Sequence, residues 1–139
     1  MAGPKPRVVF LCVHNAGRSQ MAAAWARHLG GSRVEVFSGG SDPAAVVNPS
    51  AVTVMAEAGL DIAAEAPQRW TADLVRSAEV VVTMGCGDTC PFFPGVRYED
   101  WLVPDPAGLP PAGVRSIRDE IRRRVADLLT RLGIEPASP

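Results

Sequence analysis

The sequence lacks a long apolar run, an excess of charge of one sign and any internal repeat. Its first apolar stretch, residues 8–13, is far shorter than the roughly 20 residues of a membrane-spanning helix, and it has no signal-peptide cleavage site. Fourteen basic and fifteen acidic residues give a formal net charge of −1. Near-neutrality argues against a protein that coats nucleic acid or an anionic membrane. We therefore expect a cytoplasmic protein with neither nucleic acid nor a membrane as its partner.

Cysteine is scarce as well, with only Cys12, Cys86 and Cys90 in 139 residues. Three cysteines are too few for the disulfide framework of a secreted protein. In a reducing compartment such residues pack in a core, bind a metal or react as thiols. The length fits one globular domain with a sizeable core, so we treat residues 1–139 as a single domain.

Strand and helix patterns alternate along the chain. Short β-branched or alternating runs predict strands at 7–13, 33–38, 79–84 and 97–101. Apolar residues at helical spacing, with caps and glycine stops, predict helices over 19–29, 48–58, 71–77 and 114–132. This alternation is typical of an α/β protein built from βαβ units. We expect a doubly wound, four-stranded parallel sheet in the order 2-1-3-4, with helices on both faces and a ligand crevice beyond strands 1 and 3.

The segment between the first strand and the first helix carries the clearest chemical signal. The predicted anion-binding loop reads Cys12, Val13, His14, Asn15, Ala16, Gly17, Arg18 and Ser19. A loop at this place directs main-chain N–H groups and the positive end of a helix at one point, which suits a tetrahedral oxyanion. Arg18 can add a bidentate contact, and the positive field favours the nucleophilic thiolate of Cys12. Ser19 is placed to cap the helix and to donate to the sulfur.

Two other roles for the cysteines stay open at this point. Cys12 could be a small buried residue at the end of a strand. Alternatively, Cys12, Cys86 and Cys90 could form a tetrahedral zinc site with His14. The paired spacings of structural zinc sites are missing, however, and zinc would leave the oxyanion loop without a role.

Residues 8–22, VVFLCVHNAGRSQMA, resemble the active-site loop of the low-molecular-weight protein tyrosine phosphatase superfamily. The Arg-Ser-Gln-Met-Ala continuation is most similar to the arsenate reductases of that fold. The likeness extends through TMGCGDTCP at 83–91, RYEDW at 97–101 and DPAG at 105–108, and so covers nearly the whole chain. It implies Cys12 as nucleophile, Arg18 as oxyanion ligand, Asn15 as the residue that shapes the loop and Ser19 as thiolate stabiliser. His14 is a departure, because phosphatases usually carry glycine there.

The likeness to arsenate reductases also implies a thiol relay. Reduction of arsenate takes two electrons, which thiols supply in pairs. Cys12 would attack arsenic, Cys86 would attack the Cys12 sulfur and expel arsenite, and Cys90 would resolve the disulfide. If strands 1 and 3 are neighbours, Cys12 and Cys86 leave the same edge of the sheet. We expect no bound cofactor and an external thiol reductant, thioredoxin, with glutaredoxin and mycothiol systems as alternatives.

The surroundings of the loop favour a small substrate. Asp105 lies between two prolines, and the resemblance implies that it is the general acid. Residues 39–49 contain no aromatic side chain, whereas phosphotyrosine phosphatases enclose a substrate ring between aromatic walls. Alanines at 22–24 replace the acidic potassium ligand of some relatives, so we expect no metal. The sequence therefore predicts a monomeric arsenate reductase, with a phosphomonoester hydrolase of the same fold and a non-catalytic oxyanion sensor as alternatives.

Overall fold

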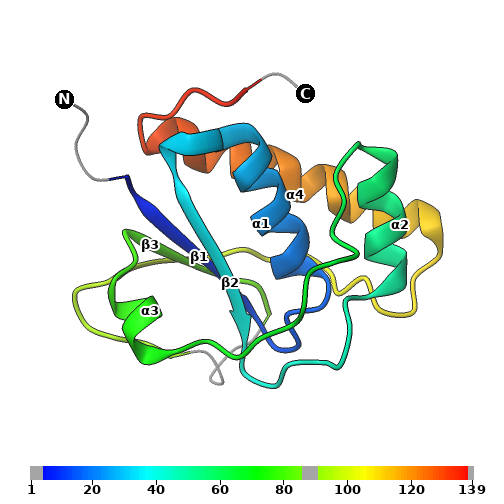
Figure 1. Cartoon of the computed structure of the whole chain (residues 1–139), viewed down its shortest axis with the longest axis horizontal. Helices are drawn as coiled ribbons and strands as arrows, with labels where there is room; N and C mark the ends of the chain where they lie inside the picture. The colour runs from blue at the N-terminus through cyan, green and yellow to red at the C-terminus, as the bar shows by residue number, and fades with distance from the viewer. Residues whose placement is uncertain (1–4, 86–90, 138–139) are drawn as a thin grey trace.

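A four-stranded parallel sheet lies at the centre of the protein, whose computed structural model describes residues 5–85 and 91–137 (Figure 1). The strands are β1 (Arg7–Cys12), β2 (Glu35–Gly40), β3 (Val80–Thr83) and β4 (Arg97–Asp100). They pair in the order β2-β1-β3-β4, every pair parallel. The predicted strand order and direction are confirmed.

Helices cover both faces of this sheet, as the sequence predicts (Figure 1). On one side lie α1 (Arg18–Gly30), α2 (Pro49–Glu57) and α4 (Pro111–Arg131), and on the other lies the short α3 (Ala72–Arg76). A 3-10 helix, η1 (Gly31–Arg33), connects α1 to β2. Of the helices in the described ranges, none is long and apolar enough to cross a membrane.

Strand β1 is buried on both faces and divides the core in two. Its residues alternate, so that Val8, Phe10 and Cys12 join the larger cluster with α1, α2 and α4. Val9 and Leu11 face the opposite way, into the smaller cluster with α3. The alternation therefore places Cys12 on the α1 side, at the carboxyl end of a rigid central strand.

Strand β2 differs from its predicted range of 33–38, since it begins at Glu35 and runs on through two glycines to Gly40. A Cβ atom at Gly39 would lie 3.0 Å from main-chain atoms of Trp70. A Cβ atom at Gly40 would lie 2.5 Å from the carbonyl oxygen of Val13. Glycine usually reads as the end of a strand, but here it lets two other segments approach the strand closely.

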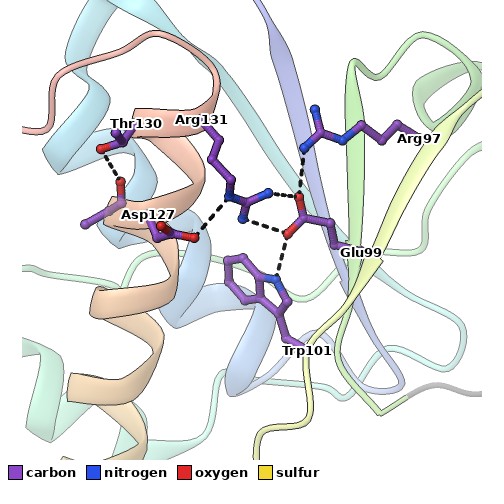
Figure 2. Close-up of polar contacts among 7 residues, drawn as sticks. Arg97, Glu99, Trp101, Asp127, Thr130 and Arg131 are labelled. Atoms are coloured by element: carbon purple, nitrogen blue, oxygen red, sulfur yellow. Dashed lines mark hydrogen bonds and ion pairs between the residues drawn. The ribbon is translucent and has the colours of Figure 1, made fainter.

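A carboxylate fixes the edge strand β4 to the last helix (Figure 2). Both oxygens of Glu99 accept hydrogen bonds from the guanidinium of Arg131, and Oε1 also accepts one from the indole N–H of Trp101 at 3.1 Å. The Trp101 ring packs against Phe10, with 5.9 Å between the ring centroids. These contacts hold the start of the segment that continues from β4 to Asp105.

Replacement of Glu99 by glutamine is expected to lower the free energy of unfolding at neutral pH by about 1–2 kcal/mol, because Arg131 loses a charged partner. The hydrogen bonds from Arg131 hold the pKa of Glu99 below the usual value of a glutamate. A carboxyl group whose pKa is lowered by folding stabilises the protein above its unfolded pKa, and this contribution disappears as the pH falls through the folded pKa. Urea unfolding at several pH values should therefore show the difference from wild type shrinking below about pH 4.5.

Glu120→Gln is the matched control for this experiment. Glu120 accepts hydrogen bonds from Arg123 and Arg124 within α4, on an exposed helix face. Such pairs stabilise proteins by about 0.5 kcal/mol or less. Equal losses in the two variants, or a loss in Glu99→Gln that does not change with pH, would contradict the role given to Glu99.

Candidate active site

The loop between β1 and α1 uses its carbonyl groups to bind a neighbouring segment. The carbonyl oxygens of Val13, His14 and Ala16 accept hydrogen bonds from main-chain N–H groups of the segment 42–48, at 2.8–3.0 Å. Among the described residues, no acceptor pairs with the N–H groups of residues 14–17. Carbonyl groups bound to a neighbour and N–H groups left unpaired are the arrangement that an oxyanion site requires.

Asn15 gives the loop its shape. It is fully buried, and its φ of 49° is the one positive value at a non-glycine position in the described part of the chain. Asparagine tolerates this left-handed conformation better than most residues. The amide oxygen accepts a hydrogen bond from the main-chain N–H of Gln68 at 2.9 Å, and the amide nitrogen donates to the hydroxyl of Ser19 at 2.8 Å. The side chain therefore connects the loop to α1 and to Gln68, whose neighbour Arg69 pairs with Gly40 at the end of β2.

The sulfur of Cys12 lies 2.8 Å from the hydroxyl oxygen of Ser19, and both residues are buried. The main-chain N–H of Gln68 can only donate, so it sets the orientation of the Asn15 amide and makes the Ser19 oxygen an acceptor. The Ser19 hydrogen is then free to donate to the sulfur.

The prediction that Ser19 caps α1 is wrong. The helix begins at Arg18, its N-cap is Gly17, and no side chain caps it. Ser19 lies inside the first turn. A capping side chain would occupy main-chain donors at the helix N-terminus, which this loop instead leaves available.

Arg18 is held beside the loop by contacts from distant parts of the chain. Its Nη1 atom donates to the carbonyl oxygen of Val103 at 3.1 Å, and its Nη2 atom lies 3.7 Å from a carboxylate oxygen of Asp105. Only 12% of the Arg18 side chain is exposed, against 56% for Asp105. The other carboxylate oxygen of Asp105 accepts a hydrogen bond from the main-chain N–H of Ala107 at 3.0 Å. A cation and a carboxylate therefore meet at the carboxyl edge of the sheet.

A cavity of about 120 Å³ opens between these groups. Its lining consists of Cys12, His14, Ala16, Gly17, Arg18, Ala44, Asn48, Asp105, Pro106 and Ala107. Among these lining residues, the imidazole of His14 is the only aromatic ring. Its Nδ1 atom lies 3.0 Å from the carbonyl oxygen of Asp42. Since a water molecule in the liquid takes up about 30 Å³, the cavity has room for a small tetrahedral anion. A larger, open hollow at the other end of the sheet contains none of the predicted site residues.

The structure thus brings together the predicted loop residues, Arg18 and Asp105, whereas Cys86 and Cys90 lie outside the described residues. Among the residues that are described, no three histidine, cysteine or acidic side chains are grouped as metal ligands.

The sequence did not reveal the roles of Gln68 and of the Val103 carbonyl, because main-chain groups and a single glutamine form no recognisable motif. Gly85, which directly precedes Cys86, also contacts Arg18. A glycine just after a strand was the one available signal.

Residues 7–137 match the profile of the family described as low molecular weight phosphotyrosine protein phosphatase. A curated protein of Halobacterium salinarum is 40% identical over 124 residues, covering 86% of this chain and 87% of the relative. Arsenate reductase 2 of Staphylococcus haemolyticus is 36% identical over 131 residues, 91% of this chain and 98% of the relative.

A solved structure is similar to this chain in its fold as well as in its sequence. The thioredoxin-dependent arsenate reductase of Corynebacterium glutamicum superposes with a TM-score of 0.82 and 41% sequence identity over 96% of this chain. The matched region is 64% of that protein's chain, so this chain spans less than two thirds of its length.

Substitutions at Asn15 should separate the backbone role of this residue from its hydrogen bonds. Asn15→Ala is expected to lower the free energy of unfolding by about 2–3 kcal/mol, because it strains the left-handed backbone and leaves the Gln68 N–H without its partner. Asn15→Gly loses the same hydrogen bonds without the strain, and should be about 1 kcal/mol less destabilising than alanine. Urea unfolding measures both. Equal stability of the two variants would show that the positive φ carries no cost.

Proposed function

The chain belongs to the low molecular weight phosphotyrosine protein phosphatase family, and within this family we propose that it is an enzyme that reduces arsenate to arsenite. The observation that carries the proposal is the placement of the Cys12 thiol in a cavity of about 120 Å³ whose other charged groups are Arg18 and Asp105. The cavity suits a bare oxyanion better than an aryl phosphate, since among the described residues that line it no Phe, Tyr or Trp is present. The similar proteins that are named arsenate reductases support the same reaction.

In the first step the Cys12 sulfur attacks arsenic. Arg18 and the N–H groups of residues 14–17 bind the arsenate oxygens and stabilise the charge that builds on them. The departing oxygen leaves as water after it receives a proton, and Asp105 is placed at the cavity rim to deliver that proton. The hydrogen bond from Ser19 stabilises Cys12 as the thiolate that attacks.

The second step transfers two electrons to arsenic. The Cys86 thiolate attacks the Cys12 sulfur, the sulfur–arsenic bond breaks, and its electron pair stays on arsenic, which leaves as arsenite. Cys90 then attacks Cys86, which releases the Cys12 thiolate and leaves a Cys86–Cys90 disulfide. The parallel pairing of β3 with β1 supports this order of thiol reactions. The main-chain N–H of Met84, the residue after β3, donates to the Leu11 carbonyl at 2.8 Å, and Cys86 follows two residues later in the chain.

An external dithiol must reduce that disulfide before the next turnover. We propose thioredoxin for this role, in line with the thioredoxin-dependent reductase of similar fold, and glutaredoxin or mycothiol systems remain chemical alternatives. Regeneration requires a reducing compartment such as the cytoplasm. The proposal treats residues 1–139 as one domain that acts as a monomer with no bound cofactor.

Mass spectrometry after a single turnover tests the relay. Reduced protein mixed with arsenate, with no reductant present, should yield one arsenite per chain and a Cys86–Cys90 disulfide. Cys12→Ser should produce no arsenite, because the attacking sulfur is gone. Cys90→Ser should stop at a Cys12–Cys86 disulfide, while Cys86→Ser should form neither disulfide. Both of these variants should bind phosphate like wild type.

Three results would contradict the proposal. Sustained turnover of Cys86→Ser or Cys90→Ser with thioredoxin would show that the relay is wrong. Hydrolysis of an aryl phosphate far faster than arsenate-dependent oxidation of thioredoxin would identify a phosphatase. Arsenite held by the thiols with no arsenate reduction would identify a sensor.

A further inference from the structure

Gly85 contacts the guanidinium group of Arg18. Gly85 lies two residues after β3 and has a φ of 81°, a conformation that residues with a side chain rarely adopt. A Cβ atom at this position would clash with Nη1 of Arg18 and would lie 3.1 Å from Cζ and 3.2 Å from Nη2. The space that a side chain would fill is therefore already taken by the guanidinium.

This contact distinguishes Gly85 from the other glycines with positive φ in the described part of the chain. At Gly31, Gly59, Gly95, Gly108 and Gly133 an added Cβ atom would meet no heavy atom within 4 Å. Glycine at those positions serves the backbone conformation alone. At residue 85 it serves both the conformation and the position of a distant side chain.

Two further contacts of Arg18 come from the segment beyond β4. The carbonyl oxygen of Val103 accepts from Nη1, the same atom that a Cβ at Gly85 would displace, and Asp105 lies 3.7 Å from Nη2. The guanidinium is thus located by the end of β3 and by the extension of β4 together. A side chain at residue 85 would move it off the Val103 carbonyl.

We propose that Gly85 is a positioning residue for the oxyanion cavity, in which the lack of a side chain lets Arg18 take its anion-binding position. The inference rests on the proposed function to the extent that Arg18 is the anion ligand. The group that a new side chain would displace is the far end of a flexible arginine, so the fold can accommodate the change. The clash with Arg18 would therefore weaken anion binding, and the loss of stability would come from the backbone strain at the positive φ alone.

Alanine substitutions at two glycines test this separation. Gly133 has a φ of 80° and open space around it, so Gly133→Ala carries the same backbone strain as Gly85→Ala without the contact to Arg18. Urea unfolding should show similar losses of stability in both variants. Titration calorimetry with inorganic phosphate should show affinity reduced about tenfold to a hundredfold in Gly85→Ala, the scale of a lost charge-assisted hydrogen bond, and unchanged affinity in Gly133→Ala.

A double-mutant cycle with Arg18→Lys shows whether the effect passes through the guanidinium. Lysine has no guanidinium to displace, so adding Gly85→Ala to Arg18→Lys should change phosphate affinity by less than about threefold. If Gly85→Ala fails to fold, Gly85→Asn adds the same Cβ atom on a residue that tolerates a positive φ, and the same loss of affinity is expected. Phosphate affinity equal to that of Gly133→Ala, or an equal loss in both arginine and lysine backgrounds, would overturn the proposal.

These measurements use phosphate binding and need no arsenate turnover. Failure of wild-type protein to reduce arsenate would remove the proposed reaction and leave the role of Gly85 in place. Normal phosphate binding by Gly85→Ala alongside normal arsenate reduction by wild type would remove the role of Gly85 and leave the reaction.

Discussion

The proposed anion site depends on one constraint: the loop after β1 can present its N–H groups to a ligand only if its carbonyl groups are satisfied elsewhere. Buried main-chain groups need partners, and an unpaired carbonyl facing an anion would repel it. The segment 42–48 meets this requirement by donating to three loop carbonyls. It can run close to the loop because β2 ends in Gly40, where a Cβ atom would lie 3.0 Å from the Asn15 nitrogen. The connection after β2 is thus part of the site.

The position of Arg18 likewise depends on a distant segment, residues 101–105, which follow β4. Glu99 and Trp101 lie on the side of the sheet that carries α4 (Figure 2). Val103, two residues further along, packs into the same core cluster. Arg131 holds Glu99, the Trp101 ring packs on Phe10, and the Val103 carbonyl accepts from Arg18. Leu102, between them, is 83% exposed. An ion pair outside the cavity lining thus holds the segment whose Val103 carbonyl orients Arg18, the proposed anion ligand.

Sequence patterns predicted the elements whose signal is local. Buried β-branched strands and helices with periodic apolar residues gave the strand order, and the segment 12–19 gave the loop. The prediction that Ser19 caps α1 was wrong. A serine at the start of a helix usually binds the first-turn N–H groups, whereas the proposed anion site needs those groups free. The Val103 carbonyl was out of reach for a different reason, since every residue has a carbonyl and only the tertiary structure selects one. Cys86 and Cys90 lie outside the described residues, so their relay still rests on their sequence and on the pairing of β1 with β3.

In the proposed reaction, the pairing of β3 with β1 links anion binding to electron transfer. A phosphatase with this loop needs water to cleave its thiol–phosphorus intermediate, whereas a reductase needs a second thiol close to the first. Gly85 lies against Arg18, and Cys86 is its neighbour along the chain. The residue proposed to position the anion ligand is therefore bonded directly to the residue proposed to attack the Cys12 sulfur. A side chain at residue 85 would disturb Arg18 whether or not Cys86 reacts. In this proposal, anion binding therefore requires the glycine at residue 85, and reduction requires the cysteine at residue 86.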